Sequence, residues 1–87
     1  MKNRDDIIRH ELENEAKNIV FTWYYNKDEA ITIDSLFIVW FAFLKNGYKC
    51  MLSSRKKPDD FFEVTVNKRT GEQFFNCFKR VGYQVKP

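Results

Sequence analysis

The chain has 87 residues, which is enough for one domain with a small core, and nine Phe, four Tyr and two Trp supply large side chains to fill it. Only three Gly and two Pro occur, without repeats, and this composition excludes a disordered or low-complexity protein. The net charge is +3, but residues 1–34 carry −3 and residues 35–87 carry +6, an asymmetry typical of proteins that meet an acidic partner and common also on solvated surfaces.

The first predicted element is a helix over about residues 5–25. Asp5 or Asp6 can cap it, because a short carboxylate accepts hydrogen bonds from the free amides of the first turn. Apolar residues then recur at the spacing of one helical face: Ile8, Leu12, Ala16, Ile19, Val20 and Trp23. The polar segment 26–29 ends the predicted helix.

The second element is the wholly apolar segment Leu36–Leu44. Its β-branched and aromatic content favours a strand over a short buried helix, and it is far shorter than the ~20 residues of a membrane span. In a regular strand the side chains alternate between two faces. One face would hold Leu36, Ile38, Trp40, Ala42 and Leu44, and the other Phe37, Val39, Phe41 and Phe43. We expect the Trp40 face to form the core beneath the helix.

Two further strands follow. Asn46-Gly47 predicts a two-residue hairpin, because this pair readily adopts the positive φ angles that such turns need. The second strand is then residues 48–54. A charged loop is predicted over 54–60, and the third strand covers 61–67.

The segment 67–81 has two interpretations. In the first, a type I turn with Gly71 in the left-handed region leads into a fourth strand over 73–81. In the second, Thr70 and Gln73 form the capping box of a helix. The hairpin is favoured, so the predicted fold class is α+β, with an N-terminal helix packed on a three- or four-stranded antiparallel meander in a single domain, 1–87. The alternative is an α-β-β-β-α chain, the element order of double-stranded-RNA-binding domains, whose lysine cluster at the start of the second helix is missing here.

The Val39-Trp40-Phe41 core and the aromatic-aromatic-Glu-Val-Thr strand at 61–65 form a specific pattern. Through this pattern, about half of the chain resembles a family of small uncharacterised proteins of phages and prophages. The wider pattern takes in Asp34, residues 37–41, Leu44, Asn46, Lys49, and residues 52–54, 61–67 and 78–79. The basic run 55–57 and Cys77 depart from it. The resemblance implies a viral or prophage setting and no chemistry.

No residue pattern indicates catalysis or a cofactor. His10 is the only histidine, and residues 10–14 lack the second His of a helical zinc motif. The adjacent pairs Asp5-Asp6 and Asp59-Asp60 point their carboxylates apart, which suits capping and loop roles. We therefore expect no enzyme activity, no catalytic residue, no metal and no cofactor.

The cysteines indicate a reducing compartment. Cys50 and Cys77 are too few for a disulfide framework or a closed zinc site, and charged residues follow Met1 where a signal peptide would be apolar. These features predict a cytoplasmic protein with two buried free thiols and no membrane contact.

One helix covers only one face of a sheet, so the second apolar face predicts an interface with a host or viral protein. Because a self-complementary patch closes as a two-fold dimer, a homodimer is also predicted. The predicted interface residues are Phe37, Val39, Phe41, Phe43 and Phe61. Coverage of both faces, by the helix and the tail at 83–85, is the competing interpretation.

The second candidate function is nucleic-acid binding, in which basic residues bind phosphates and exposed aromatic rings stack on bases. The candidate phosphate-binding residues are Lys49, Arg55, Lys56, Lys57, Lys68, Arg69, Lys79 and Arg80. In a meander, however, Lys45, Lys68 and Arg69 lie at one end of the sheet and the run 55–57 at the other, so only Lys49, Lys79 and Arg80 could bridge the two groups.

Overall fold

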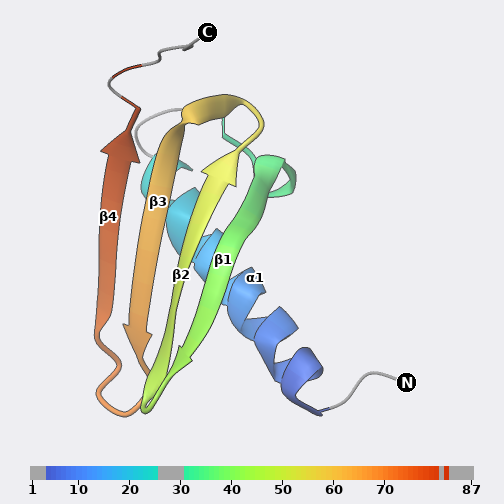
Figure 1. Cartoon of the computed structure of the whole chain (residues 1–87), viewed down its shortest axis with the longest axis vertical. Helices are drawn as coiled ribbons and strands as arrows, with labels where there is room; N and C mark the ends of the chain where they lie inside the picture. Colours follow the sequence, from blue (N-terminus) through green and yellow to red (C-terminus); the bar gives the residue numbers. More distant parts are fainter. Residues whose placement is uncertain (1–3, 26–30, 81, 83–87) are drawn as a thin grey trace, which may run out of the picture.

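The structure, a computed structural model, describes residues 4–25, 31–80 and 82. Its elements are helix α1 (Arg4–Tyr25), the short 3-10 helix η1 (Ile33–Ser35) and strands β1 (Leu36–Leu44), β2 (Gly47–Ser54), β3 (Lys57–Asn67) and β4 (Gln73–Lys79). The strands form one antiparallel sheet in the order β1-β2-β3-β4 (Figure 1). The predicted helix-on-meander fold is therefore confirmed, and residues 73–79 form a strand instead of a C-terminal helix.

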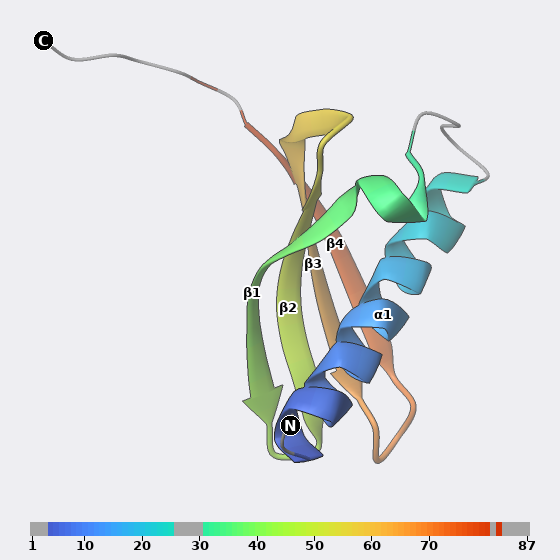
Figure 2. The same cartoon turned by 90° about the vertical axis from the view of Figure 1, so that its right-hand side faces the viewer.

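The core lies between α1 and one face of the sheet. The helix crosses that face diagonally, and the opposite face is left without a covering layer in the described part of the chain (Figure 2). Ala16 and Val20, which are fully buried, bring α1 onto the sheet. Beneath them lie the buried residues Leu36, Tyr48, Cys50, Leu52, Phe62, Val64 and Val66. None of the described helices is long and apolar enough to cross a bilayer.

A β-bulge interrupts β1 at Val39. Ile38 lies opposite Leu52 and Trp40 lies opposite Met51, which leaves Val39 as an extra residue between two neighbours on β2. Since directly opposite residues share a face, the bulge reverses the alternation halfway along the strand. Leu36 and Ile38 before it, and Phe41 and Phe43 after it, therefore lie on the helix side. The predicted division of β1 into two regular faces is wrong for this reason.

The β1–β2 turn consists of Lys45 and Asn46, and Gly47 already pairs with Leu44 as the first residue of β2. Among the described residues only Gly71 has a positive φ, so the expected left-handed Asn46-Gly47 pair is wrong. Gly47 is required for a different reason. A Cβ atom at this position would lie 1.8 Å from the carbonyl oxygen of Val66 on β3.

The predicted charged loop is much shorter than expected. Arg55 and Lys56 alone make the β2–β3 turn, and Lys57 already pairs with Ser54. A register shift between Ser53 and Ser54 accommodates Pro58, which fits a strand only at an edge or an irregularity. The hydroxyl of Ser53 donates to the carbonyl oxygen of Asp60 over 2.9 Å, and this bond helps to hold the irregular pairing.

The β3–β4 turn has the predicted form. Gly71 adopts φ +81°, and its amide donates to the carbonyl oxygen of Asn67 over 2.7 Å. The side-chain oxygen of Asn67 accepts from the amides of Arg69 and Thr70, at 2.9 and 3.2 Å. β4 ends at Lys79, two residues before the predicted end of this strand at Val81. Val81 itself lies outside the described residues.

Candidate binding surface on the open sheet face

The sheet face opposite α1, called here the open face, is built by all four strands. The register places its side chains in three levels across the sheet. The first level is Phe37, Ser53, Phe61 and Phe78; the second is Trp40, Met51, Glu63 and Asn76; the third is Ala42, Lys49, Thr65 and Phe74. Leu44, which lies opposite Gly47, is one level further along β1.

Large apolar side chains on this face are in contact with solvent. Phe37, Trp40, Leu44, Phe74 and Phe78 are between 37% and 54% exposed. Soluble monomers rarely expose contiguous apolar patches of more than a few hundred Å², and larger patches mark interaction sites. Five such side chains on one four-stranded face therefore identify the open face as the candidate binding surface.

The charged residues of the open face form a pair near its centre. The Lys49 ammonium lies 3.7 Å from a Glu63 carboxylate oxygen, and the two side chains are 40% and 20% exposed. A pair this exposed adds little to stability, because water screens it. Its main effect is that the centre of the apolar face carries one charge of each sign.

The predicted interface residues are divided between two sides of the sheet. Phe37 and Phe61 lie on the open face, and Val39 is 46% exposed at the bulge. Phe41 lies on the helix side, where its ring stacks on Tyr48 at 5.4 Å and the guanidinium of Arg9 lies 5.3 Å from its centroid. Phe43 is also on the helix side but is 53% exposed at the sheet edge. The structure therefore does not bring the five together.

Five large apolar residues of the open face were missed by sequence reasoning: Trp40, Leu44, Met51, Phe74 and Phe78. Phe74 and Phe78 carried a usable signal, since both share a strand face once residues 73–79 are read as a strand opposite β3. Trp40 carried none, because its side depends on a bulge within a uniformly apolar segment.

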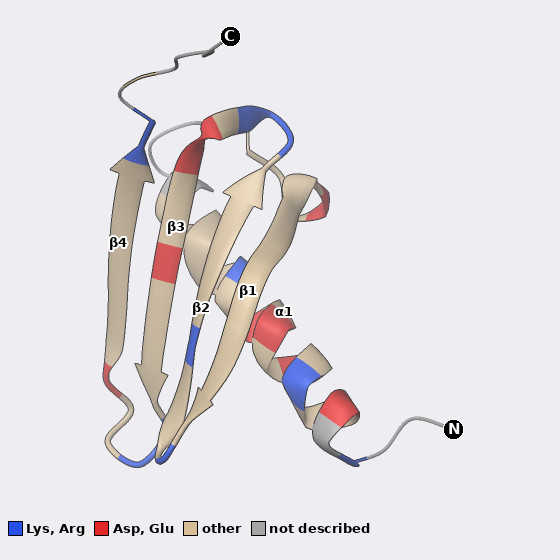
Figure 3. Ribbon diagram, in the orientation of Figure 1, with Lys and Arg blue, Asp and Glu red and all other residues tan. Residues whose placement is uncertain are grey.

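The basic residues lie mainly at the two ends of the sheet, as the meander predicted (Figure 3). The turns at one end carry Lys45, Lys68 and Arg69, and the other end carries Arg55, Lys56, Lys57, Lys79 and Arg80. Lys68 pairs with Glu15 of α1, and Arg80 lies 3.7 Å from Asp59. The candidate phosphate-binding residues thus form no continuous stripe, and Lys49 is the member of the set that lies on the open face.

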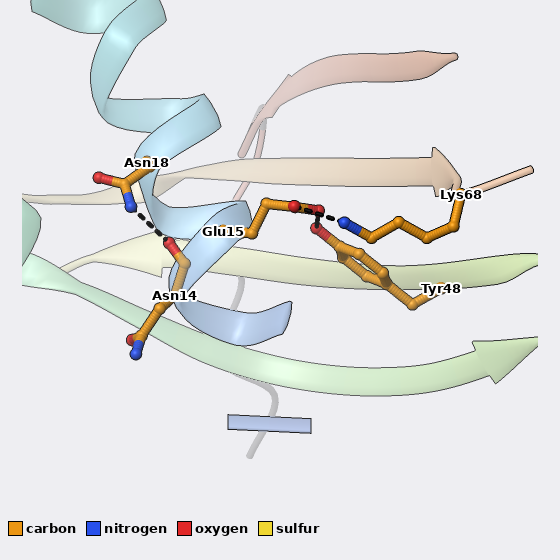
Figure 4. A network of polar contacts seen from close by, with 5 residues as sticks. All are labelled: Asn14, Glu15, Asn18, Tyr48 and Lys68. Carbon is orange, nitrogen blue, oxygen red and sulfur yellow. Dashed lines mark hydrogen bonds and ion pairs between the residues drawn. The ribbon is translucent and has the colours of Figure 1, made fainter. Parts of the chain in front are cut away.

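A polar network joins α1 to the sheet on the side that the helix covers (Figure 4). One Glu15 oxygen accepts from the Tyr48 hydroxyl over 2.8 Å, and the other accepts from the Lys68 ammonium over 2.5 Å. Partial burial opposes ionisation of Glu15, but the Lys68 and Tyr48 hydrogen bonds outweigh it and lower the pKa of this carboxyl. Burial, with the Glu15 carboxylate beside it, raises the pKa of Tyr48. This network fastens the helix to the sheet.

A hollow of about 540 Å³ lies beside this network, lined by polar side chains and Ile19 of α1 and by Gln73 of β4. It contains no histidine, cysteine or serine, and in the described chain no three His, Cys, Asp or Glu side chains gather as metal ligands would.

The two thiols differ in accessibility. Cys50 is buried in the core, and burial together with the charge of Glu13 raises its pKa to about 12. Cys77 lies on the edge strand β4 and is exposed, so the prediction of a buried thiol is wrong at this position. The helix packs against β1, β2 and β3 more than against β4, which explains the difference.

Comparison with known proteins yields one relationship. No curated protein and no solved structure shows significant similarity to the chain. Residues 13–85, which include most of α1 and all four strands, match the model of a family of unknown function, DUF6275. The match covers well over half of the sequence, and the chain therefore belongs to the DUF6275 family.

Proposed function

We propose that this protein is a non-enzymatic binding protein whose open face docks onto another macromolecule. One observation carries the proposal: five large apolar side chains from β1 and β4 are more than a third exposed on a single sheet face. A rigid four-stranded sheet holds these side chains in place, so docking costs little conformational entropy. On the helix side, in contrast, the Phe41 ring stacks on Tyr48, and the Tyr48 hydroxyl donates to Glu15, so these groups pack within the chain.

Photo-crosslinking from the open face tests this function. A benzophenone side chain placed at Phe78 in cells should give discrete adducts, because this residue is 48% exposed on the open face, at the β4 edge. The matched control places the same group at His10, which is exposed on α1 away from the sheet. Adducts from position 78 and none from position 10 support the proposal. Equal labelling from both positions, or none from either, contradicts it.

Nucleic-acid binding is the second candidate, and Lys49 is the observation that favours it. Its ammonium stands among the exposed rings of the open face, where it could contact a phosphate while a base stacks on Trp40. The nearby Glu63 carboxylate, which would repel a phosphate, weighs against this function. Binding of random-sequence single-stranded RNA or DNA at low salt is the test. Absence of binding there excludes this candidate, whereas binding that weakens steeply with added salt supports it.

We further propose a phage or prophage setting for the protein, with a cytoplasmic location. The resemblance described for residues 34–79 supports the setting, and the free thiol Cys77 is in keeping with a reducing compartment. A survey of the genes that encode DUF6275 proteins tests it: consistent occurrence outside prophage regions would contradict the proposal.

A further inference from the structure

We propose that the open face binds the open face of a second copy of this chain, around a two-fold axis parallel to the strands. This inference rests on the proposed function and names the partner. In such a dimer the two sheets pack face to face, at the crossing angle of about −30° that aligned sheets adopt. β1 of one copy then lies over β4 of the other, and β2 lies over β3.

The sizes of the side chains match under this rotation. In the second level the bulky Trp40 on β1 comes to lie over the smaller Asn76 of the other copy's β4. In the third level the small Ala42 on β1 receives the bulky Phe74. Large side chains thus face small ones in both levels, which is what close packing between two layers requires. In the first level Phe37 meets Phe78, and two aromatic rings can stack there.

The charges match as well. β2 of one copy lies over β3 of the other, which places Lys49 over Thr65 and one level away from the second copy's Glu63. The existing pair within each chain, 3.7 Å apart, then lies beside the same pair of the second copy, so that two charges of each sign gather at the centre of the interface. A face with one Lys and one Glu is complementary to itself, whereas a nucleic acid would leave Glu63 against phosphate.

The area of the open face is sufficient for a specific dimer. Four strands about 4.8 Å apart and about eight residues long at about 3.3 Å per residue give a face of roughly 500 Å². Two copies contribute roughly 1,000 Å² of flat area, and the relief of the side chains increases the accessible surface. The total approaches the ~1,200–2,000 Å² of standard interfaces.

Charge reversal and mixing test the dimer. Lys49→Glu gives an open face with two acidic groups, and Glu63→Lys gives one with two basic groups. Each variant alone should dimerise about tenfold or more weakly than the wild type in sedimentation velocity, because like charges then face each other. An equimolar mixture of the two should recover the dimer. Mixing cannot restore the pair within a chain, so recovery reports contacts between chains.

Matched controls are Lys56→Glu, in the exposed β2–β3 turn, and Glu72→Lys, in the exposed β3–β4 turn. These make the same changes in net charge outside the open face and should leave the dimer unchanged. Circular dichroism of each variant checks the fold. If a single variant unfolds, the double variant Lys49→Glu/Glu63→Lys, which retains one charge of each sign, should fold and dimerise.

A wild type that sediments as a monomer up to high micromolar concentration overturns the dimer, as does a mixture that stays monomeric while both variants fold. The crosslinking experiment separates this failure from that of the proposed function. Adducts of Phe78 with a different protein or a nucleic acid, from a monomeric chain, leave the binding surface in place and reject the second copy as its partner. Adducts with twice the mass of the chain support the dimer.

Discussion

The carbonyl oxygen of Val66 occupies the space where a side chain at position 47 would begin. Gly47→Ala would place a Cβ atom 1.8 Å from this backbone oxygen, so β2 and β3 would have to separate or shift register. We expect a loss of about 3 kcal/mol in the free energy of unfolding, at the upper end of what overpacking costs. Urea denaturation monitored by circular dichroism measures it.

Gly71→Ala is the matched control for this prediction. Gly71 has open space around it, but its φ of +81° disfavours other residues, so the substitution should cost about 1 kcal/mol. A smaller loss for Gly47→Ala than for Gly71→Ala would contradict the close approach of the two strands.

Glu15 connects the helix to the sheet through Tyr48 and Lys68, and its low pKa has a consequence for acid stability. Because the pKa of the folded state lies below the ordinary 4.5, the stabilisation is present above that value and is lost as the pH falls through the folded pKa. Glu15→Gln should therefore lower stability at neutral pH by about 0.5–1 kcal/mol, a discounted figure because the carboxylate is partly exposed.

The same variant should lose less stability than the wild type between about pH 5 and pH 3, because it no longer has this carboxylate to protonate. Urea denaturation at a series of pH values compares the two chains. Parallel stability curves across this range would show that the network contributes nothing to folding.

At the scale of elements, the bulge determines which residues of β1 meet the helix. Deletion of Val39 would restore regular alternation, so either the Leu36 and Ile38 pair or the Phe41 and Phe43 pair would have to leave the helix side. We expect a loss of about 3 kcal/mol or more, from the apolar surface returned to water. Val39→Ala, which keeps the bulge and shortens a half-exposed side chain, should change stability by less than about 0.5 kcal/mol. Thermal unfolding of both variants tests this, and equal effects would contradict it.

How far the sequence predicts each element depends on how local its signals are. The helix and the limits of β1 follow from periodicity and composition within the segments themselves. The bulge does not, because a nine-residue apolar segment looks the same in either register, and pairing with β2 selects one. Residues 57–60 resemble a loop, with Pro58 and two aspartates, yet the pairing of Lys57 with Ser54 makes them a strand. Because of the bulge, two of the five predicted interface residues, Phe41 and Phe43, lie on the helix side of the sheet.

For the whole molecule, a dimer of folded chains links stability to concentration. A partner that binds only the folded state raises Tm by mass action, and a hundredfold increase in concentration adds up to about 2.7 kcal/mol per dimer. The Tm of the wild type should therefore rise with concentration, while that of Lys49→Glu should change much less. Calorimetry at several concentrations measures both, and a constant wild-type Tm would count against the dimer.

The bulge at Val39 also affects whether strands of other molecules can add to the β1 edge of the sheet. β1 is an outer strand without a single charged residue, and such an edge is a template on which strands of other molecules can add without limit. The extra residue breaks the regular row of hydrogen-bonding groups along this edge into two short pieces. Fibril growth from β1 is thereby disfavoured, whereas a two-fold pairing of sheet faces ends with two chains. One inserted residue thus directs the core side chains and shortens the edge on which a strand of another molecule could add.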